Sequence, residues 1–184
     1  MVSKVVVADS IGAVDDPAAE GLHHLHIAQI FNQCFRSSYA TEMKGGADEP
    51  HYLPAAGGQY AQLHYREDFA ASALHEAAHW CIAGVRRRLM EDFGYAYLTP
   101  PRDDQQQLRF FAFEVRNQSL ESLFAAAAGN HFDVSADNPT WDLTEFRAQV
   151  GAQREATRQW LQSDAGERAR TFIEALSIAS SAGR

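Results

Sequence analysis

The sequence predicts an α+β fold: a single, mostly helical domain with a small sheet, against which a metal-binding helix packs. Apolar residues recur at helical spacing over most of the chain, whereas short alternating runs broken by glycine and proline occupy residues 39–66. An alanine-rich segment with the pattern H-E-x-x-H follows directly after those runs. With 184 residues, 46% of them hydrophobic, the chain is long enough to bury one core.

Composition and charge narrow the possible function classes. No apolar run approaches the roughly 20 residues that span a bilayer, so we expect no membrane association. Two cysteines without a Cys-x-x-Cys pattern, and a start that lacks a signal-peptide core, predict a cytoplasmic protein with reduced thiols. The formal net charge of −8 argues against direct binding of nucleic acid.

We divide the chain into an N-terminal extension at residues 1–17, a single metal-binding catalytic domain at residues 18–179 and a loose tail at residues 180–184. Residues 18–35 are predicted to form the first helix, because their apolar side chains follow a period of about 3.6 residues. Three histidines lie in this helix, and a metal site is one interpretation of them. We favour a solvated face with one half-buried histidine, because no acid joins them at ligand spacing. They are His23, His24 and His26.

Short strands joined by turns are predicted between residues 39 and 54, where apolar runs alternate with glycines and prolines. The segment 59–66 alternates by face and is the clearest strand of the chain. It leads through Asp68 directly into the helix that carries the H-E-x-x-H pattern. A strand in this position would fix where that helix begins.

The motif helix is predicted to run from a cap at Asp68 to an end at Gly84, with alanines in between. Residues four apart lie on one face of a helix, so His75 and His79 can offer two imidazole nitrogens to one metal ion, with Glu76 beside them. The competing interpretation is an ordinary helix with two histidines, and the small, capped surroundings favour the metal. The motif alone identifies neither the metal nor the reaction.

The rest of the chain is predicted to be helical. Residues 85–94 form a further turn or two, a helix follows at 103–114, and another runs from 118 to 128, capped by Asn117 and stopped by Gly129. Two scaffold helices without assigned chemistry complete the domain. They begin at Thr144 and Ser163.

Two histidines leave a divalent ion under-coordinated, so a third protein ligand is expected. Glu114 is the best candidate, because it follows the aromatic run 110–113 and a buried carboxylate needs a partner; the alternative is a helix-end glutamate beside Arg116. Glu121 is the reserve, although a predicted helix break separates it from Glu114, and Asp137 comes third. Histidine alternatives are those near the chain start, His51, His64 and His131.

Taken together, these motifs resemble the bacterial elongation factor P hydroxylase family. The similarity extends from about residue 22 to residue 172. It is carried by the motif helix with Arg87 and Arg88 after it, and by residues 48–54, 92–97, 105–106, 114–120 and 132–138. The resemblance implies an α+β fold similar to that of a metal-binding bacterial endoribonuclease family. It also implies a hydroxylase (monooxygenase) that acts on the β-lysylated lysine of elongation factor P.

By motif position, the resemblance implies a centre of Fe(II) held by His75, His79 and Glu114, with molecular oxygen as co-substrate. Hydroxylation of an unactivated carbon needs a redox metal with open coordination positions. Two histidines and one carboxylate leave such positions open on the metal. Zinc cannot replace the redox metal, because it has no redox chemistry. Glu76 would then orient a ligand or hold the amine of the substrate instead of acting as a hydrolytic base.

A protein substrate with a cationic arm places two demands on the surface. The pocket must be negative, and Glu76, Glu114 or Asp137 can supply that charge. The rim must meet the protein body, for which we predict Arg87 and Arg88, within a pool that also contains Arg86, Arg102 and Arg109. The alternative is that the arginines only stabilise the end of the motif helix.

Two other functions compete with the hydroxylase. In a zinc metallopeptidase, Glu76 would activate a metal-bound water. In a non-catalytic binding module, a metal would be structural or absent. Oxidation of elongation factor P would distinguish the hydroxylase from the peptidase and the binding module.

Overall fold

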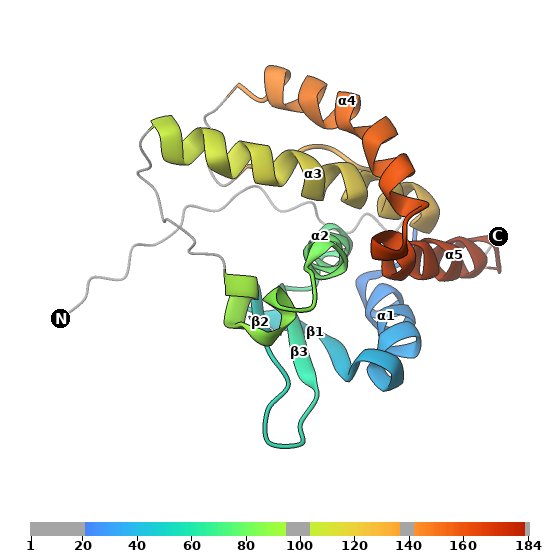
Figure 1. The fold of residues 1–184 in the computed structure, drawn as a ribbon. Coiled ribbons are helices and arrows are strands. Elements are labelled where there is room, and N and C mark those ends of the chain that lie inside the picture. The colour runs from blue at the N-terminus through green and yellow to red at the C-terminus, as the bar shows by residue number, and fades with distance from the viewer. Residues whose placement is uncertain (1–20, 95–103, 137–141, 183–184) are drawn as a thin grey trace.

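The computed structural model of the chain describes residues 21–94, 104–136 and 142–182 (Figure 1). Helices dominate, and three short strands form one small sheet. The predicted mostly helical α+β fold is therefore confirmed, and the extension predicted at residues 1–17 lies outside the described residues. No helix within the described ranges is both long and apolar enough to cross a membrane.

The sheet contains β1 (Thr41–Ala47), β2 (His51–Leu53) and β3 (Ala61–Arg66), in the order β1-β3-β2. The central strand β3 pairs in parallel with β1 and antiparallel with β2, and its alternate residues are buried, as its sequence pattern predicts. Gly45 allows the ring of Tyr65 to cross over β1, since a Cβ there would lie only 2.5 Å from that ring. The predicted strands are thus confirmed.

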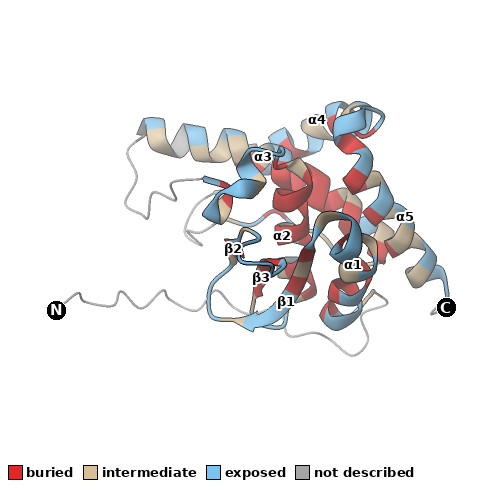
Figure 2. Ribbon diagram, turned by 60° about the horizontal axis from the view of Figure 1, so that its bottom comes forward, coloured by how far each residue is buried: buried red, intermediate tan, exposed pale blue. Residues whose placement is uncertain are grey.

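Helix α2 (Ala70–Ile82) carries the H-E-x-x-H pattern and lies at the centre of the fold, in contact with the sheet and with α1, α3 and α5. Figure 2 shows burial concentrated along α2 and on the segments around it. Its Trp80 is fully buried against Phe31 and Phe35 of α1 (His24–Tyr39), at ring-centroid distances of 5.0 and 4.7 Å. Aromatic packing therefore fixes the helix that holds both histidines.

The ends of α2 differ from the prediction. The helix starts after Phe69, without a side-chain cap, and Asp68 instead lies 3.7 Å from Nδ1 of the buried His24. The C-terminal cap is Ala83 instead of Gly84. Arg168 explains this end, because its guanidinium donates to the carbonyl oxygens of Trp80, Cys81 and Ala83 and satisfies them in place of a glycine turn.

Two short 3₁₀ turns follow α2, η1 (Arg87–Leu89) and η2 (Glu91–Gly94), as predicted for this segment. Helix α3 then runs without interruption from Asp104 to Ala128. The predicted break before residue 118 is therefore wrong, because Asn117 is fully buried inside α3 and caps nothing. Burial against α2 overrides the local capping preference. Gly129, with φ of 75°, follows the end of α3 as predicted.

Helices α4 (Thr144–Leu161) and α5 (Glu167–Ala182), joined by the 3₁₀ turn η3 (Asp164–Gly166), complete the fold and pack against α3. Phe146 and Val150 of α4 form a small second core, and Phe172 of α5 belongs to the main core. Residues 180–182, predicted as part of a loose tail, continue α5 instead.

Candidate metal centre

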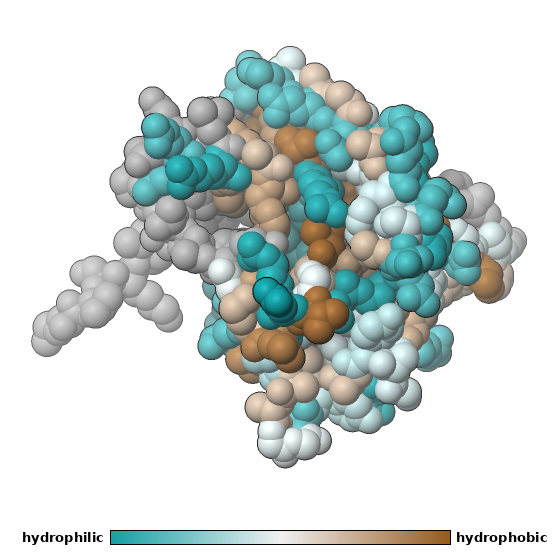
Figure 3. All heavy atoms as spheres, viewed as in Figure 1, coloured by the Kyte–Doolittle hydropathy of each residue, from teal (hydrophilic) through white to brown (hydrophobic). Residues whose placement is uncertain are grey.

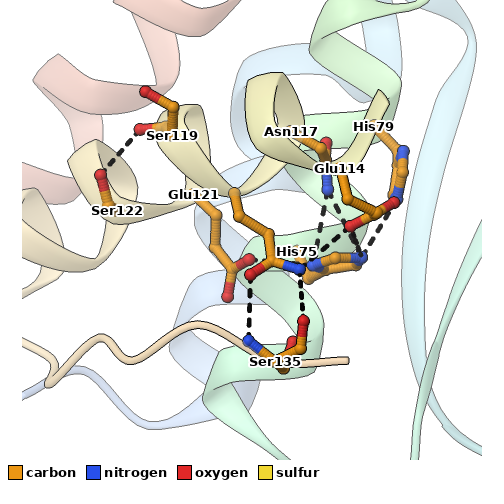
Figure 4. Close-up of polar contacts among 9 residues, drawn as sticks. His75, His79, Glu114, Asn117, Ser119, Glu121, Ser122 and Ser135 are labelled. Carbon is orange, nitrogen blue, oxygen red and sulfur yellow. Dashed lines mark hydrogen bonds and ion pairs between the residues drawn. The ribbon is translucent and has the colours of Figure 1, made fainter. Parts of the chain in front are cut away.

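The facing sides of α2 and α3 bring three potential metal ligands together. His75 and His79 come from α2, and Glu114 comes from α3 (Figure 4). The Nε2 atoms of the two histidines lie 3.0 Å apart. The carboxylate of Glu114 places Oε1 3.5 Å from Nε2 of His79 and Oε2 3.8 Å from Nε2 of His75. The three residues predicted as metal ligands thus converge on one point.

The geometry and chemistry of these donors fit a divalent ion. Ligand atoms that share one ion at bond lengths of about 2.1 Å lie roughly 3 to 3.5 Å from one another, close to the distances observed here. His79 and Glu114 are only 3% and 4% exposed, and a buried carboxylate needs a cationic or hydrogen-bonding partner. Two imidazoles and one carboxylate suit iron, manganese or zinc.

The electrostatic surroundings favour a cation. Burial alone would lower the pKa of His75, but the nearby carboxylates of Glu121, Glu114 and Glu76 outweigh it and raise that pKa to about 10. Burial raises the pKa of Glu76 to about 7, an effect that His75 reduces and the neighbouring acids reinforce. Burial lowers the pKa of His79 well below its usual value. The centre therefore holds more buried acid than the histidines alone balance.

Glu121, the reserve ligand, also reaches His75, but from the opposite side. Its Oε2 lies 2.9 Å from Nδ1 of His75. This contact was not expected, because the sequence predicted a helix break between Glu114 and Glu121. Since α3 is continuous, the two acids lie about two turns apart on one face and both point toward α2.

Two polar residues of α3 support the centre and were missed from the sequence. Gln118 donates to Oε2 of Glu114 at 3.1 Å and is itself held by the backbone of Ser135. Nδ2 of Asn117 lies 3.4 Å from both ring nitrogens of His75. Their positions three and four residues after Glu114 were a usable signal, but only for a helix predicted to be continuous.

The other predicted candidates lie elsewhere. His51 contacts Glu91 at 2.8 Å, and His64 contacts Gln62 at 3.0 Å. His51 and Glu91 form a second group of possible ligands with Asp92, in which Glu91 is exposed and the other two side chains are half-buried. His131 is exposed on the loop after α3, and Asp137 lies outside the described residues.

The histidine predicted to be half-buried among the three near the chain start corresponds to His24, whose Nδ1 lies 2.9 Å from the hydroxyl of Tyr65. His23 and His26 are exposed, and the side chain of His23 caps the start of α1. The predicted solvated face is confirmed, but its one inward histidine is buried instead of half-buried, because the ring of His24 packs against Tyr65.

The arginines after α2 have different surroundings. Arg88 donates to the carbonyl oxygen of Ala83 at 2.8 Å and its guanidinium lies over Trp80, so it stabilises the end of the motif helix. Arg87 is exposed and donates to the carbonyl oxygen of Phe93. Arg109 is exposed on α3, and Arg102 lies outside the described residues.

A hollow of about 560 Å³ lies between the end of α2 and α3. Its lining includes the apolar side chains of Ile82, Val85 and Phe113. Three arginines also line it, namely Arg86, Arg87 and Arg116. Phe113 stacks on the ring of His79, with ring centroids 5.3 Å apart, so the hollow adjoins the metal centre. Val85 and Leu89, just before and within the η1 turn, are exposed. Figure 3 shows hydrophobic side chains gathered on the face where Figure 1 places the two 3₁₀ turns.

Comparison with known proteins adds an independent finding to this geometry. The sequence matches the family model described as elongation factor P hydroxylase over residues 30–181. The chain belongs to the elongation factor P hydroxylase family. A relative from Haemophilus influenzae, named elongation factor P lysine hydroxylase, is 40% identical over 151 residues, which cover 82% of this chain and 85% of the relative. The match to the hydroxylase family includes both histidines and all the α3 residues that surround them.

Proposed function

We propose that this protein is a non-heme Fe(II)-dependent hydroxylase that adds one oxygen atom to the β-lysylated lysine of elongation factor P. Membership of the hydroxylase family and the name of the relative support elongation factor P as the substrate and its lysine as the target. The observation that carries the metal assignment is the convergence of His75, His79 and Glu114. Bound there, Fe(II) would supply the oxygen activation that an unactivated carbon requires.

The charge of the centre supports a cationic substrate arm. Three carboxylates are buried there, those of Glu76, Glu114 and Glu121, and metal-bound histidines are neutral. A divalent ion balances two of these negative charges, so one remains. We assign this remaining charge to Glu76, whose pKa of about 7 leaves it partly ionised at neutral pH and which would hold an ammonium group of the β-lysyl arm as it approaches the metal.

The way into the centre passes His75. Its side chain is 23% exposed, whereas His79 and Glu114 are almost fully buried. The stacked ring of Phe113 covers His79, and Gln118 holds Glu114 in place. Water therefore has little access from these sides, and the substrate arm is expected to enter beside His75.

We propose Arg87 as a contact for the body of elongation factor P, with Arg86 and Arg116 on the same hollow. Exposed apolar residues beside these arginines suit a protein partner better than a small ion. Arg88 remains a candidate only through its exposed part, because its guanidinium is engaged at the end of α2. Asp137 stays a prediction for substrate binding.

Incubation with β-lysylated elongation factor P, Fe(II), oxygen and a reductant tests the function. Intact-mass spectrometry should show an increase of one oxygen atom on the modified lysine. Zn(II) in place of Fe(II), and the Glu114→Ala variant with Fe(II), should give none, because each lacks a competent redox centre.

Unmodified elongation factor P serves as the substrate control and should be a much poorer substrate. Cleavage of the factor with Zn(II), and no oxidation with Fe(II), would instead indicate the zinc peptidase. Neither reaction, despite metal binding, would favour the binding module.

A further inference from the structure

We infer that Glu121 is a positioning residue that fixes the orientation of His75, and not a ligand of the metal. The inference rests on the proposed metal centre and assigns a separate task to each of the two acids of α3. Glu114 faces the shared nitrogens, whereas Glu121 faces the other side of the same imidazole ring.

The hydrogen-bonding pattern of His75 determines its tautomer. Its Nε2 points toward His79 and Glu114, while its Nδ1 lies 2.9 Å from Oε2 of Glu121. A carboxylate accepts hydrogen bonds, so Nδ1 carries the hydrogen and donates it to Glu121. In the neutral form that binds a metal, the lone pair then lies on Nε2, the atom that faces the metal position.

Burial makes this hydrogen bond persistent. Glu121 is only 5% exposed, so water does not readily replace either partner. The N–H bond at Nδ1 and the lone pair at Nε2 point in divergent directions, so an oxygen hydrogen-bonded at Nδ1 does not share an ion bound at Nε2. The group of mutually close ligand atoms accordingly contains His75, His79 and Glu114 but not Glu121.

One helix supplies the whole arrangement. On α3, Asn117 lies three residues after Glu114 and Glu121 lies seven residues after it, a spacing that places all three on one face. Glu114 and Glu121 contact opposite ends of the His75 ring, and Nδ2 of Asn117 is equally far, 3.4 Å, from both of its nitrogens. Three side chains of α3 therefore surround the ring of His75, and among them Glu121 makes the short hydrogen bond.

His79 shows what this arrangement adds. Its Nδ1 is buried and has no hydrogen-bond partner within the residues that the structure describes, so its ring is held by stacking on Phe113. The two ligands thus depend on different supports. Loss of Glu121 should affect the orientation of His75 alone.

The test measures equilibrium Co(II) affinity by competition with a chelator, for wild type and two variants. Glu121→Ala removes the acceptor and should weaken binding roughly 10- to 100-fold. Glu121→Gln keeps an oxygen that can accept from Nδ1 and should recover most of that loss. Glu174→Gln, which removes the same charge from the exposed face of α5, is the matched control and should bind as wild type.

The absorption spectrum of bound Co(II) separates positioning from ligation. Both Glu121 variants should keep the wild-type ligand number and hence its band intensities, whereas Glu114→Ala should change them. Circular dichroism checks the fold, and the nearly isosteric Gln variant keeps the test informative if Glu121→Ala does not fold.

Wild-type affinity in Glu121→Ala would overturn the inference. The inference would also fail if both Glu121 variants lost Co(II) affinity equally and showed the spectral change expected for Glu114→Ala, since Glu121 would then be a ligand. Absence of metal binding by the wild type would remove the inference along with the metal centre. If wild type and the Glu121 variants show the predicted order of Co(II) affinities but the protein does not hydroxylate elongation factor P, the proposed reaction fails and the role of Glu121 stands.

Discussion

Gln118 shows how a side chain outside the proposed ligand set can position one of its members. It donates to Oε2 of Glu114 at 3.1 Å and is anchored through its amide to the backbone of Ser135. Such contacts orient a ligating carboxylate before the metal arrives. The loop after α3 thereby takes part in positioning Glu114, the proposed third ligand.

We predict that Gln118→Leu weakens metal binding by about 10-fold, because Glu114 loses its donor while the apolar volume stays similar. Chelator competition measures the change. Gln149→Leu on the exposed side of α4 is the control and should have no effect. Unchanged affinity in Gln118→Leu would show that Glu114 is held by other contacts.

The convergence of His75, His79 and Glu114 was predictable at this scale, whereas the side chains that support them were not. The i, i+4 spacing of His75 and His79 follows from helical geometry alone. Glu114 followed from the need of a buried carboxylate for a partner. Asn117 and Gln118 follow Glu114 at helical spacing, but that signal is usable only if the helix is continuous, and the sequence predicted a break at Asn117.

At the scale of elements, the end of α2 depends on α5. Arg168 is 8% exposed and donates to the carbonyl oxygens of Trp80, Cys81 and Ala83. These carbonyls have no partner within the helix that ends there. A residue far along the chain therefore completes the helix that carries the histidines.

We predict that Arg168→Met lowers the free energy of unfolding by about 2 to 4 kcal/mol, since buried carbonyls lose a charged donor and Met replaces only its apolar volume. Urea denaturation measures the loss. Arg158→Met on the exposed surface of α4 should stay within about 0.5 kcal/mol of wild type. A similarly small change in Arg168→Met would mean that the carbonyls find other partners.

The sequence predicted the kinds of elements better than their continuity. The alternating pattern of β3 and the glycine after α3 are local signals, and both were confirmed. The break predicted at Asn117 was wrong, because a residue that favours helix caps was buried by tertiary packing in mid-helix. This error mattered, since it separated Glu121 from the site.

At the scale of the whole molecule, the net charge of −8 contrasts with the three arginines around the hollow beside the metal centre. Charges at the rim of an interface act mainly on the rate of association and are screened by salt. A local positive rim can therefore guide a protein partner to an acidic enzyme.

We predict that Arg87→Glu slows hydroxylation of intact elongation factor P at low salt, and that the defect shrinks as salt is added. Metal affinity should not change. Arg158→Glu on α4 makes the same charge reversal away from the hollow and should have little effect. Unchanged turnover of Arg87→Glu at low salt would show that Arg87 has only a structural role.

The convergence of α2 and α3 on one metal position is the central claim, and anomalous diffraction from crystals grown with Mn(II) or Fe(II) tests it most directly. We predict a peak within bonding distance of Nε2 of His75, Nε2 of His79 and the carboxylate of Glu114. Glu121 should remain on the Nδ1 side of His75. A peak bonded to Glu121, a peak only at the His51 group, or no peak at all would contradict the account.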